Sequence, residues 1–223
     1  VALLEQRDRH MADHARKVQC YAAKIAAQMG LPERVAGRLQ VAAMLHDIGM
    51  LALPDAVLLN PERLDDSQKQ LMRRHPLLSV RVMEGMEFLE AEIPAVRYHH
   101  EHYDGTGYPE GIAGAAIPLT ARILSVADSF DAMTSSRAYR PGRSFAEACA
   151  ELERSAGTQF DPAVVEAFLA VARRQGAALL DEAEAAELTW PGPSEAVAAD
   201  DKAAAPASPA PPLRHPSPNP QDT

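Results

Sequence analysis

The sequence predicts an all-α protein, a helical bundle followed by a disordered C-terminal tail. Before residue 180, apolar residues recur at three- and four-residue steps, which is the period of a helix buried on one face. We find no convincing strand pattern and no internal repeat. Nine of the 18 prolines fall in residues 191–223, where a Pro, Ala and Ser composition cannot bury enough surface to offset its ordering entropy. We therefore expect a helical domain over 1–176, a short acidic helix over 177–190 and a disordered tail over 191–223.

The first two helices are predicted by apolar stripes and by signals at their ends. The first helix closes at Gly30, and the second begins near Pro32. The apolar stripe of the second helix runs up to His46 and Asp47. Gly49 is then expected to end this helix as a C-terminal glycine.

Proline and capping signals divide the middle of the chain. A turn passes through Pro54 and Pro61. Asp65, with Gln68 three residues later, predicts a capping box for the following helix. Pro76 removes a backbone donor, so we expect it to kink the path of that helix.

Three further segments complete the expected bundle. A helix over roughly 92–101 carries His99 and His100, and a glycine-rich loop over 103–117 follows it. The next helix contains Asp128.

The last two helices of the domain have clear N-terminal signals. Ser144 with Glu147 predicts a capping box, and Asp161 followed by Pro162 predicts an N-cap with proline in the first turn.

Composition excludes several classes of protein. A hydrophobic content of 47% excludes disorder throughout, and a net charge of −9 excludes a generally basic nucleic-acid binder. No apolar run approaches the roughly 20 residues of a membrane span. Cys20 and Cys149 are too few for a disulfide framework, so we expect reduced core cysteines in a cytoplasmic protein. Because the chain begins at Val1 without an initiator Met, we expect a longer parent protein with an upstream sensory or receiver domain.

Histidines are the most informative residues. Seven of the eight lie between His10 and His102. A lone histidine on an apolar face is usually a hydrogen-bonded core residue, but the adjacent pairs at 46–47 and 99–100 concentrate imidazole and carboxylate groups. Their burial costs much free energy unless a cation binds them. Imidazole with carboxylate suits Fe, Mn or Zn, and the number of such ligands suggests two or more ions.

Two motifs resemble a known family. The sequences HDIG at 46–49 and HHEHYDGTGYP at 99–109 resemble the HD-GYP domain, a branch of the HD metal-dependent phosphohydrolases that hydrolyses cyclic di-GMP. The resemblance extends from about Arg7 to Leu169 and implies a helical bundle of the HD-domain type. It implies metal ligands at the following positions: His14, His46, Asp47, His75, His99, His100 and Asp128. It also makes His46 and Asp47 the catalytic pair, with Asp47 bridging two ions, Fe or Mn being favoured.

The sequence departs from the family pattern at two positions. The family usually has a substrate-binding lysine where this chain has Met50. Loss of one cation from a phosphate clamp should cost on the order of 1 to 3 kcal/mol. Members with three metals tend to carry Glu one helical turn before the first ligand histidine, where this chain has His10. His10 is therefore either a ligand of a third ion or an exposed N-terminal histidine.

The resemblance also suggests residues around the ions. Arg137 and Arg140 occupy positions of cationic substrate contacts, unless they are ordinary surface arginines. Tyr108 faces substrate or a partner protein, or anchors its loop, and Asp131 is placed with the substrate contacts. We expect Glu101 and Asp104 to accept hydrogen bonds from the metal-bound imidazoles and so to orient them.

These observations favour a cyclic di-GMP phosphodiesterase that produces linear pGpG and, in a further step, GMP. The principal alternative is a weak or inactive module that regulates by binding cyclic di-GMP or a GGDEF-domain protein, the latter through the Gly-Tyr-Pro loop. A third alternative is an HD phosphohydrolase for another nucleotide. The intact ligand set favours the enzyme over a scaffold.

Overall fold

The computed structural model describes residues 9–58, 60, 64–136 and 141–186, which belong to one unit within residues 1–192. The predicted tail over 191–223 and the arginines at 137 and 140 lie outside these residues. The described helices are α2 Arg9–Gln28, α3 Glu33–Leu45, α4 Asp55–Leu58, α5 Asp66–Met72, α6 His75–Met83, α7 Ile93–Tyr98, α8 Leu119–Thr134, α9 Phe145–Arg154, α10 Pro162–Gln175 and α11 Ala178–Ala185. Short 3-10 helices are η1 Ile48–Ala52, η2 Glu87–Leu89 and η3 Gly114–Ala116.

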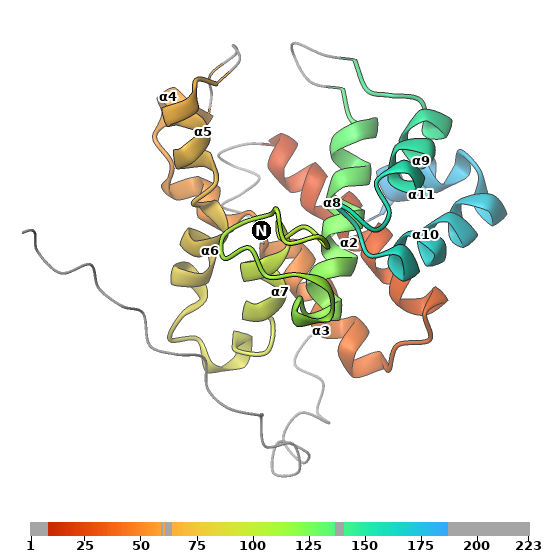
Figure 1. The fold of residues 1–223 in the computed structure, drawn as a ribbon, viewed down its shortest axis with the longest axis horizontal. Coiled ribbons are helices and arrows are strands. Elements are labelled where there is room, and N and C mark those ends of the chain that lie inside the picture. The colour runs from red at the N-terminus through yellow and green to blue at the C-terminus, as the bar shows by residue number, and fades with distance from the viewer. Residues whose placement is uncertain (1–8, 59, 61–63, 137–140, 187–223) are drawn as a thin grey trace, which may run out of the picture. The chain divides into compact units, whose positions relative to one another are not determined.

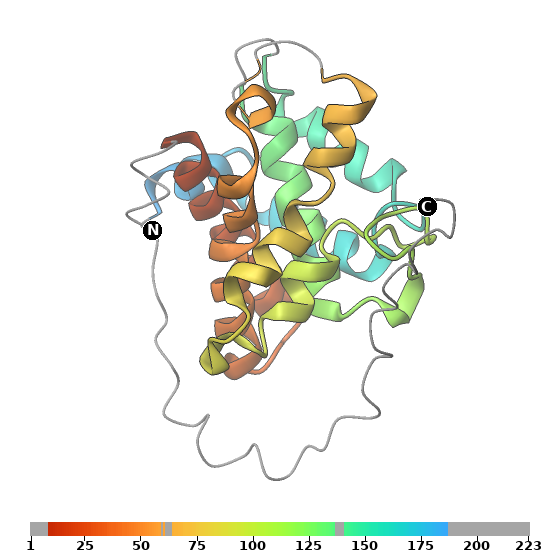
Figure 2. The ribbon, with the colours of Figure 1, turned by 90° about the vertical axis from the view of Figure 1, so that its left-hand side faces the viewer.

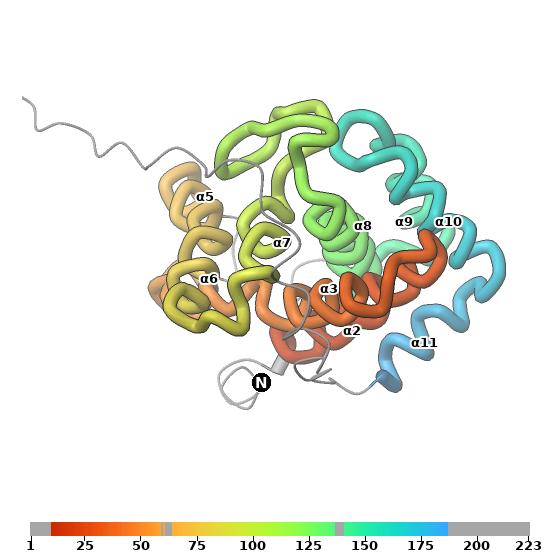
Figure 3. Tube along the Cα trace, turned by 90° about the horizontal axis from the view of Figure 1, so that it is seen from below, coloured from red at the N-terminus to blue at the C-terminus, as the bar shows by residue number. Residues whose placement is uncertain are grey.

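The all-α prediction is confirmed for the described residues, whose only β feature is an isolated bridge between Ala156 and Phe160. Helix α2 packs on α3, α8, α10 and α11, while α7 packs on α3, α6 and α8. Figures 1 and 3 both show α5 and α6 on one side of α8 and α9 to α11 on the other, and Figure 2 shows the bundle from the side. None of the described helices is long and apolar enough to cross a membrane.

The larger apolar cluster centres on Phe130 of α8. Its ring lies edge-on to Tyr21 of α2 at 5.1 Å between centroids, and 4.6 Å from the ring of Phe168 in α10. Leu179 and Ala183 of α11 are buried in the same cluster. The cluster therefore extends beyond residue 176 into the segment predicted as a short acidic helix.

A smaller cluster holds α3, α6 and α7 together. Its buried members are Val41, Ala42, Met83, Leu89, Ala95 and Val96. Most of these residues lie in helices that carry or precede the predicted ligand histidines. The cluster therefore holds the ends of those helices close to one another.

Three end signals are confirmed. Asp65 with Gln68 and Ser144 with Glu147 both form complete capping boxes, and the Asp161 side chain accepts from the backbone N–H of Ala163.

Two predicted helix ends were wrong. Pro76 does not kink a continuous helix: it lies in the first turn of α6, a separate helix, where its missing N–H costs nothing. Helix α7 ends at Tyr98, so His99 and His100 follow the helix instead of lying within it.

The expected C-terminal role of Gly49 was also wrong. Helix α3 ends at Leu45, and Gly49 lies inside η1 without a left-handed backbone. A Cβ at this position would lie 2.3 Å from the backbone nitrogen of Ser79 and 2.4 Å from the carbonyl oxygen of His75. Glycine is therefore needed for a close approach between η1 and α6.

Candidate metal centre

Three buried histidines each follow the end of a helix and share one hydrogen-bond pattern. In each, the ring Nδ1 lies close to the carbonyl oxygen three residues earlier: His46 to Ala43 at 2.8 Å, His75 to Met72 at 2.8 Å and His99 to Val96 at 2.7 Å. A carbonyl only accepts, so each Nδ1 carries the proton. The neutral ring then presents its Nε2 lone pair, and the helix end gains a partner for an orphan carbonyl.

These Nε2 atoms converge. His75 Nε2 lies 3.4 Å from His99 Nε2 and 3.1 Å from His100 Nε2. Within the described chain, the buried Nε2 of His46 has no hydrogen-bond partner. Buried lone pairs at these separations repel unless a proton or a cation lies between them. The donor set therefore fits metal ions.

Asp47 lies between two sets of histidines. Its Oδ1 is 3.1 Å from His75 Nε2, whereas its Oδ2 is 3.5 Å from His46 Nε2 and 3.8 Å from His14 Nε2. The two oxygens of one carboxylate thus face different groups of ligands.

His14 joins α2 to α8 through two carboxylates. Its Nε2 lies 3.2 Å from Asp128 Oδ1, and its Nδ1 donates to Asp131 Oδ2 at 2.7 Å. Asp131 is only 2% exposed. The structure therefore places Asp131 behind His14, where it orients the imidazole, and not at a substrate surface as we expected.

Burial and charge set the protonation of these groups. Burial lowers the pKa of His99 well below 6.5, with His100 adding to the effect, and burial also lowers the pKa of His100 to about 4. Both rings are therefore uncharged at neutral pH, and each can offer a nitrogen lone pair to a metal ion. Burial alone would lower the pKa of His14, but hydrogen bonds to Asp128 and Asp131 raise it to about 10. A cation at this position must displace that proton.

Candidate ligand atoms form three overlapping groups, each with all its donor atoms within 4.8 Å of one another. They are His14 with His46 and Asp128; His46 with Asp47 and His99; and His75 with His99 and His100. All seven predicted ligands are included. His10 is exposed at the start of α2 and belongs to none of these groups.

A family model described as HD domain matches residues 1–164. The chain belongs to the HD domain family. It is 39% identical over 168 residues to the cyclic di-GMP phosphodiesterase response regulator RpfG of Xanthomonas campestris, covering 74% of this chain and 44% of the relative. The chain thus spans less than half the length of that relative. The match confirms the predicted HD-GYP family.

Solved structures share the fold of this HD domain. An HDG"Y"P protein from Bdellovibrio bacteriovorus matches with a TM-score of 0.61 and 19% identity, covering 73% of this chain and 52% of that one. A cyclic GMP-AMP-specific phosphodiesterase of Vibrio cholerae matches with a TM-score of 0.59 and 21% identity, covering 76% and 45%.

Ser79, which no sequence pattern selects, links Gly49 of the HDIG motif to His46. Its Oγ accepts from the Gly49 N–H at 2.8 Å and donates to the His46 carbonyl at 2.7 Å. Ser79 is fully buried in α6. This contact places His75, at the start of the same helix, beside Asp47.

The Gly-Tyr-Pro loop of the HD domain packs directly on His100, one of the candidate ligands. The Tyr108 N–H donates to the His100 carbonyl at 3.1 Å, and its ring stacks on the His100 ring at 4.8 Å. A Cβ on Gly107 would lie 2.2 Å from the backbone nitrogen of His102. Glycine is thus required for the loop to approach this closely.

Glu101 and Asp104 hold this loop and do not contact the ligand histidines, contrary to our expectation. The Glu101 carboxylate accepts from the N–H groups of Glu110 and Gly111. Asp104 accepts from the backbone and hydroxyl of Thr106. The groups behind the imidazoles are instead backbone carbonyls and Asp131, which apolar periodicity does not reveal.

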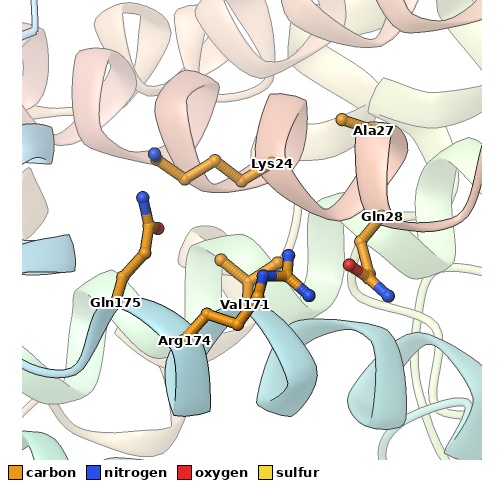
Figure 4. Close-up of a pocket in the computed structure, with 6 residues that line it drawn as sticks. All are labelled: Lys24, Ala27, Gln28, Val171, Arg174 and Gln175. Atoms are coloured by element: carbon orange, nitrogen blue, oxygen red, sulfur yellow. The ribbon is translucent and has the colours of Figure 1, made fainter.

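The remaining expectations concern cations. Met50 is half-buried in η1, where its N–H donates to the Asp47 carbonyl at 2.9 Å, and its side chain carries no charge. Arg137 and Arg140 lie outside the described residues. A separate pocket of about 260 Å³ between α2 and α10 contains none of the predicted site residues (Figure 4). It is lined by Lys24, Ala27, Gln28, Val171, Arg174 and Gln175.

Proposed function

We propose that this HD domain is the catalytic part of a metal-dependent phosphodiesterase that hydrolyses cyclic di-GMP to pGpG, with GMP as a further product. The observation that carries the proposal is the convergence of buried Nε2 lone pairs on both sides of Asp47. The number of donors exceeds one tetrahedral coordination sphere, which supports two ions, with Fe or Mn suited to imidazole and carboxylate.

We assign the residues to two ions that share a carboxylate. His14, His46 and Asp128 would hold one ion, and His75, His99 and His100 would hold the second. Asp47 faces both groups, so its carboxylate would be shared between them. Bound divalent ions supply an activated water and polarise the phosphodiester, so the chain needs no nucleophile of its own.

The protein's contribution is to fix the ligands before the ions bind. Helix-end carbonyls hold three imidazoles in the tautomer that offers Nε2, and Asp131 does the same for His14. The three inner histidines, His46, His75 and His99, are almost completely buried. The side chains of His14, Asp47 and Asp128 are 18%, 18% and 15% exposed. A substrate therefore approaches from the side of these three residues.

The choice of substrate rests on a relative's name. RpfG of Xanthomonas campestris is named a cyclic di-GMP phosphodiesterase, which favours the enzyme over a regulatory module. Another relative is named a 3'3'-cGAMP-specific phosphodiesterase, so that dinucleotide is the proper comparison substrate. A cytoplasmic location, a GGDEF-domain partner and an upstream sensory domain stay predictions.

The test uses purified protein loaded with Fe(II) or Mn(II) and incubated separately with cyclic di-GMP and 3'3'-cGAMP, with products separated by chromatography. We expect at least two ions per chain by elemental analysis, and faster loss of cyclic di-GMP with pGpG appearing first. Fewer than one ion per chain would remove the metal centre. Faster hydrolysis of 3'3'-cGAMP would reassign the substrate while leaving the centre intact.

A further inference from the structure

Arg73 is an exposed arginine next to the candidate metal centre that no motif assigns. It follows the last residue of α5 and precedes the ligand His75 by two positions. Its guanidinium carbon lies 5.4 Å from the centroid of the Tyr108 ring, within the range of a cation–π contact. The same tyrosine ring stacks on His100 at 4.8 Å with an interplanar angle of 25°. One aromatic ring thus connects Arg73 to a metal ligand.

The backbones on both sides of this contact are anchored. Tyr108 is anchored by its N–H bond to His100, and the Arg73 N–H donates to the Lys69 carbonyl at 2.9 Å. Arg73 follows α5, whereas Tyr108 belongs to the Gly-Tyr-Pro loop, which comes much later in the sequence. Two independent segments therefore converge beside His100.

The charge of Arg73 is available for a ligand. Among the described residues no carboxylate forms an ion pair with it, whereas several other cations are paired. These are Lys17 with Glu184, Lys24 with Glu182, Arg122 with Asp161 and Arg143 with Glu151. The ligand groups contribute the carboxylates of Asp47 and Asp128, and Met50 supplies no cation. The metal ions would bind the phosphate that is cut, and Arg73 is placed to bind an anionic group beside it.

We propose that Arg73 and Tyr108 form an outer subsite that binds the second phosphodiester of a cyclic dinucleotide while the first lies over the metal ions. This inference rests on the proposed function. A guanidinium binds a phosphodiester through two parallel charge-assisted hydrogen bonds. Because Arg73 is separated from His100 by the tyrosine ring, it contacts the part of the substrate that is not cut. It is a substrate-positioning residue for this chain, in place of a lysine at 50.

The test compares Arg73→Ala and Arg73→Lys with Arg74→Ala, a matched removal of an exposed arginine one residue away. Binding is measured with a phosphorothioate analogue of cyclic di-GMP, and kcat and KM are measured with cyclic di-GMP and with bis(p-nitrophenyl) phosphate, which has a single phosphodiester. For Arg73→Ala we expect Kd and KM for the dinucleotide to rise by about 10- to 100-fold, as loss of a charge-assisted bond implies. The rise for bis(p-nitrophenyl) phosphate should be much smaller. Arg73→Lys should recover part of the loss, and Arg74→Ala should bind like wild type.

Several results would overturn the subsite. Dinucleotide binding by Arg73→Ala at the wild-type level would do so, as would equal losses in Arg73→Ala and Arg74→Ala. A fall in metal content, or equal losses in kcat for both substrates, would show that Arg73 supports the metal centre and not the second phosphate. Wild-type protein that hydrolyses bis(p-nitrophenyl) phosphate but binds no dinucleotide would instead refute the proposed substrate class.

Discussion

The cluster around Phe130 and the interior of the candidate metal centre are both buried but are filled in opposite ways. Phe130 is 0% exposed and meets the rings of Tyr21 and Phe168. His99 is also 0% exposed, yet its Nε2 faces another imidazole lone pair. Apolar burial stabilises the fold without a ligand, whereas convergent lone pairs cost free energy until a cation binds. Stability and function should therefore be separable in this chain.

The two regions meet on one helix. Phe130 and Asp131 are neighbours in α8, and the first belongs to the apolar cluster while the second bonds His14. Substitutions on either side of this boundary test whether the separation is real.

The largest effect is expected from Asp47→Ala. It removes the carboxylate between both ligand groups, so hydrolysis should fall below detection and metal content should drop. Thermal stability of the metal-free protein should fall less than in Phe130→Ala, because Asp47 loses contacts to three imidazoles but no apolar packing. Activity assays, elemental analysis and melting of the chelated protein measure these outcomes. Asp66→Ala, at a 95% exposed side chain, is the control, and normal turnover by Asp47→Ala would contradict the assignment.

Phe130→Ala should have the opposite profile. Truncating a fully buried phenylalanine typically costs about 3–5 kcal/mol of unfolding free energy, which urea denaturation would measure. The protein that stays folded should keep its metal content, because Phe130 belongs to the cluster and not to the ligands. Should the variant not fold, the milder Phe130→Leu can replace it. Metal loss without destabilisation would show that the two regions are coupled.

Gly49→Ala lies at the junction and should affect both properties moderately. The new Cβ would contact the Ser79 backbone and the His75 carbonyl, and overpacking of this kind typically costs about 1–3 kcal/mol. Movement of α6 would also separate His75 from Asp47, so metal content should fall. Gly37→Ala is a matched control in α3, where a Cβ would meet nothing within 4 Å, and it should be neutral or slightly stabilising. Equal behaviour of the two variants would remove the role given to Gly49.

The smallest effect concerns Glu92, a buried acid outside the metal centre. Burial raises its pKa above 4.5, and its Oε2 has no partner among the described residues. A raised pKa in the folded state means that stability is retained below pH 4.5 and lost as pH rises through the folded pKa. Glu92→Gln should therefore gain on wild type as pH rises from 4.5 to neutral, when urea denaturation is compared across this range. Glu151→Gln should show the opposite sign, because hydrogen bonding to Arg143 lowers the Glu151 pKa.

The fold was predictable from sequence, and the family resemblance predicted which seven side chains come together, whereas the contacts that hold them were not predictable. Helical periodicity and the capping boxes at Asp65 and Ser144 are local signals, so they survive folding unchanged. The role of Asp131 depends on which helix packs across from α8, and periodicity identifies a face but not its partner. Gly49 was misjudged for the same reason, since its constraint comes from α6. Arg73 carries no motif and acquires meaning only when Tyr108 is placed beside it.

The hydrogen bonds from the three inner histidines have a consequence for how this centre tolerates sequence change. Their acceptors are main-chain carbonyls of Ala43, Met72 and Val96. Side-chain replacement at these positions leaves the acceptor atom in place. Such a substitution should therefore not change which imidazole nitrogen carries the proton. Only a change that unwinds the last helical turn removes the acceptor. The tautomer of these imidazoles is therefore set by the helix ends themselves, and no particular residue type at these positions marks it in the sequence.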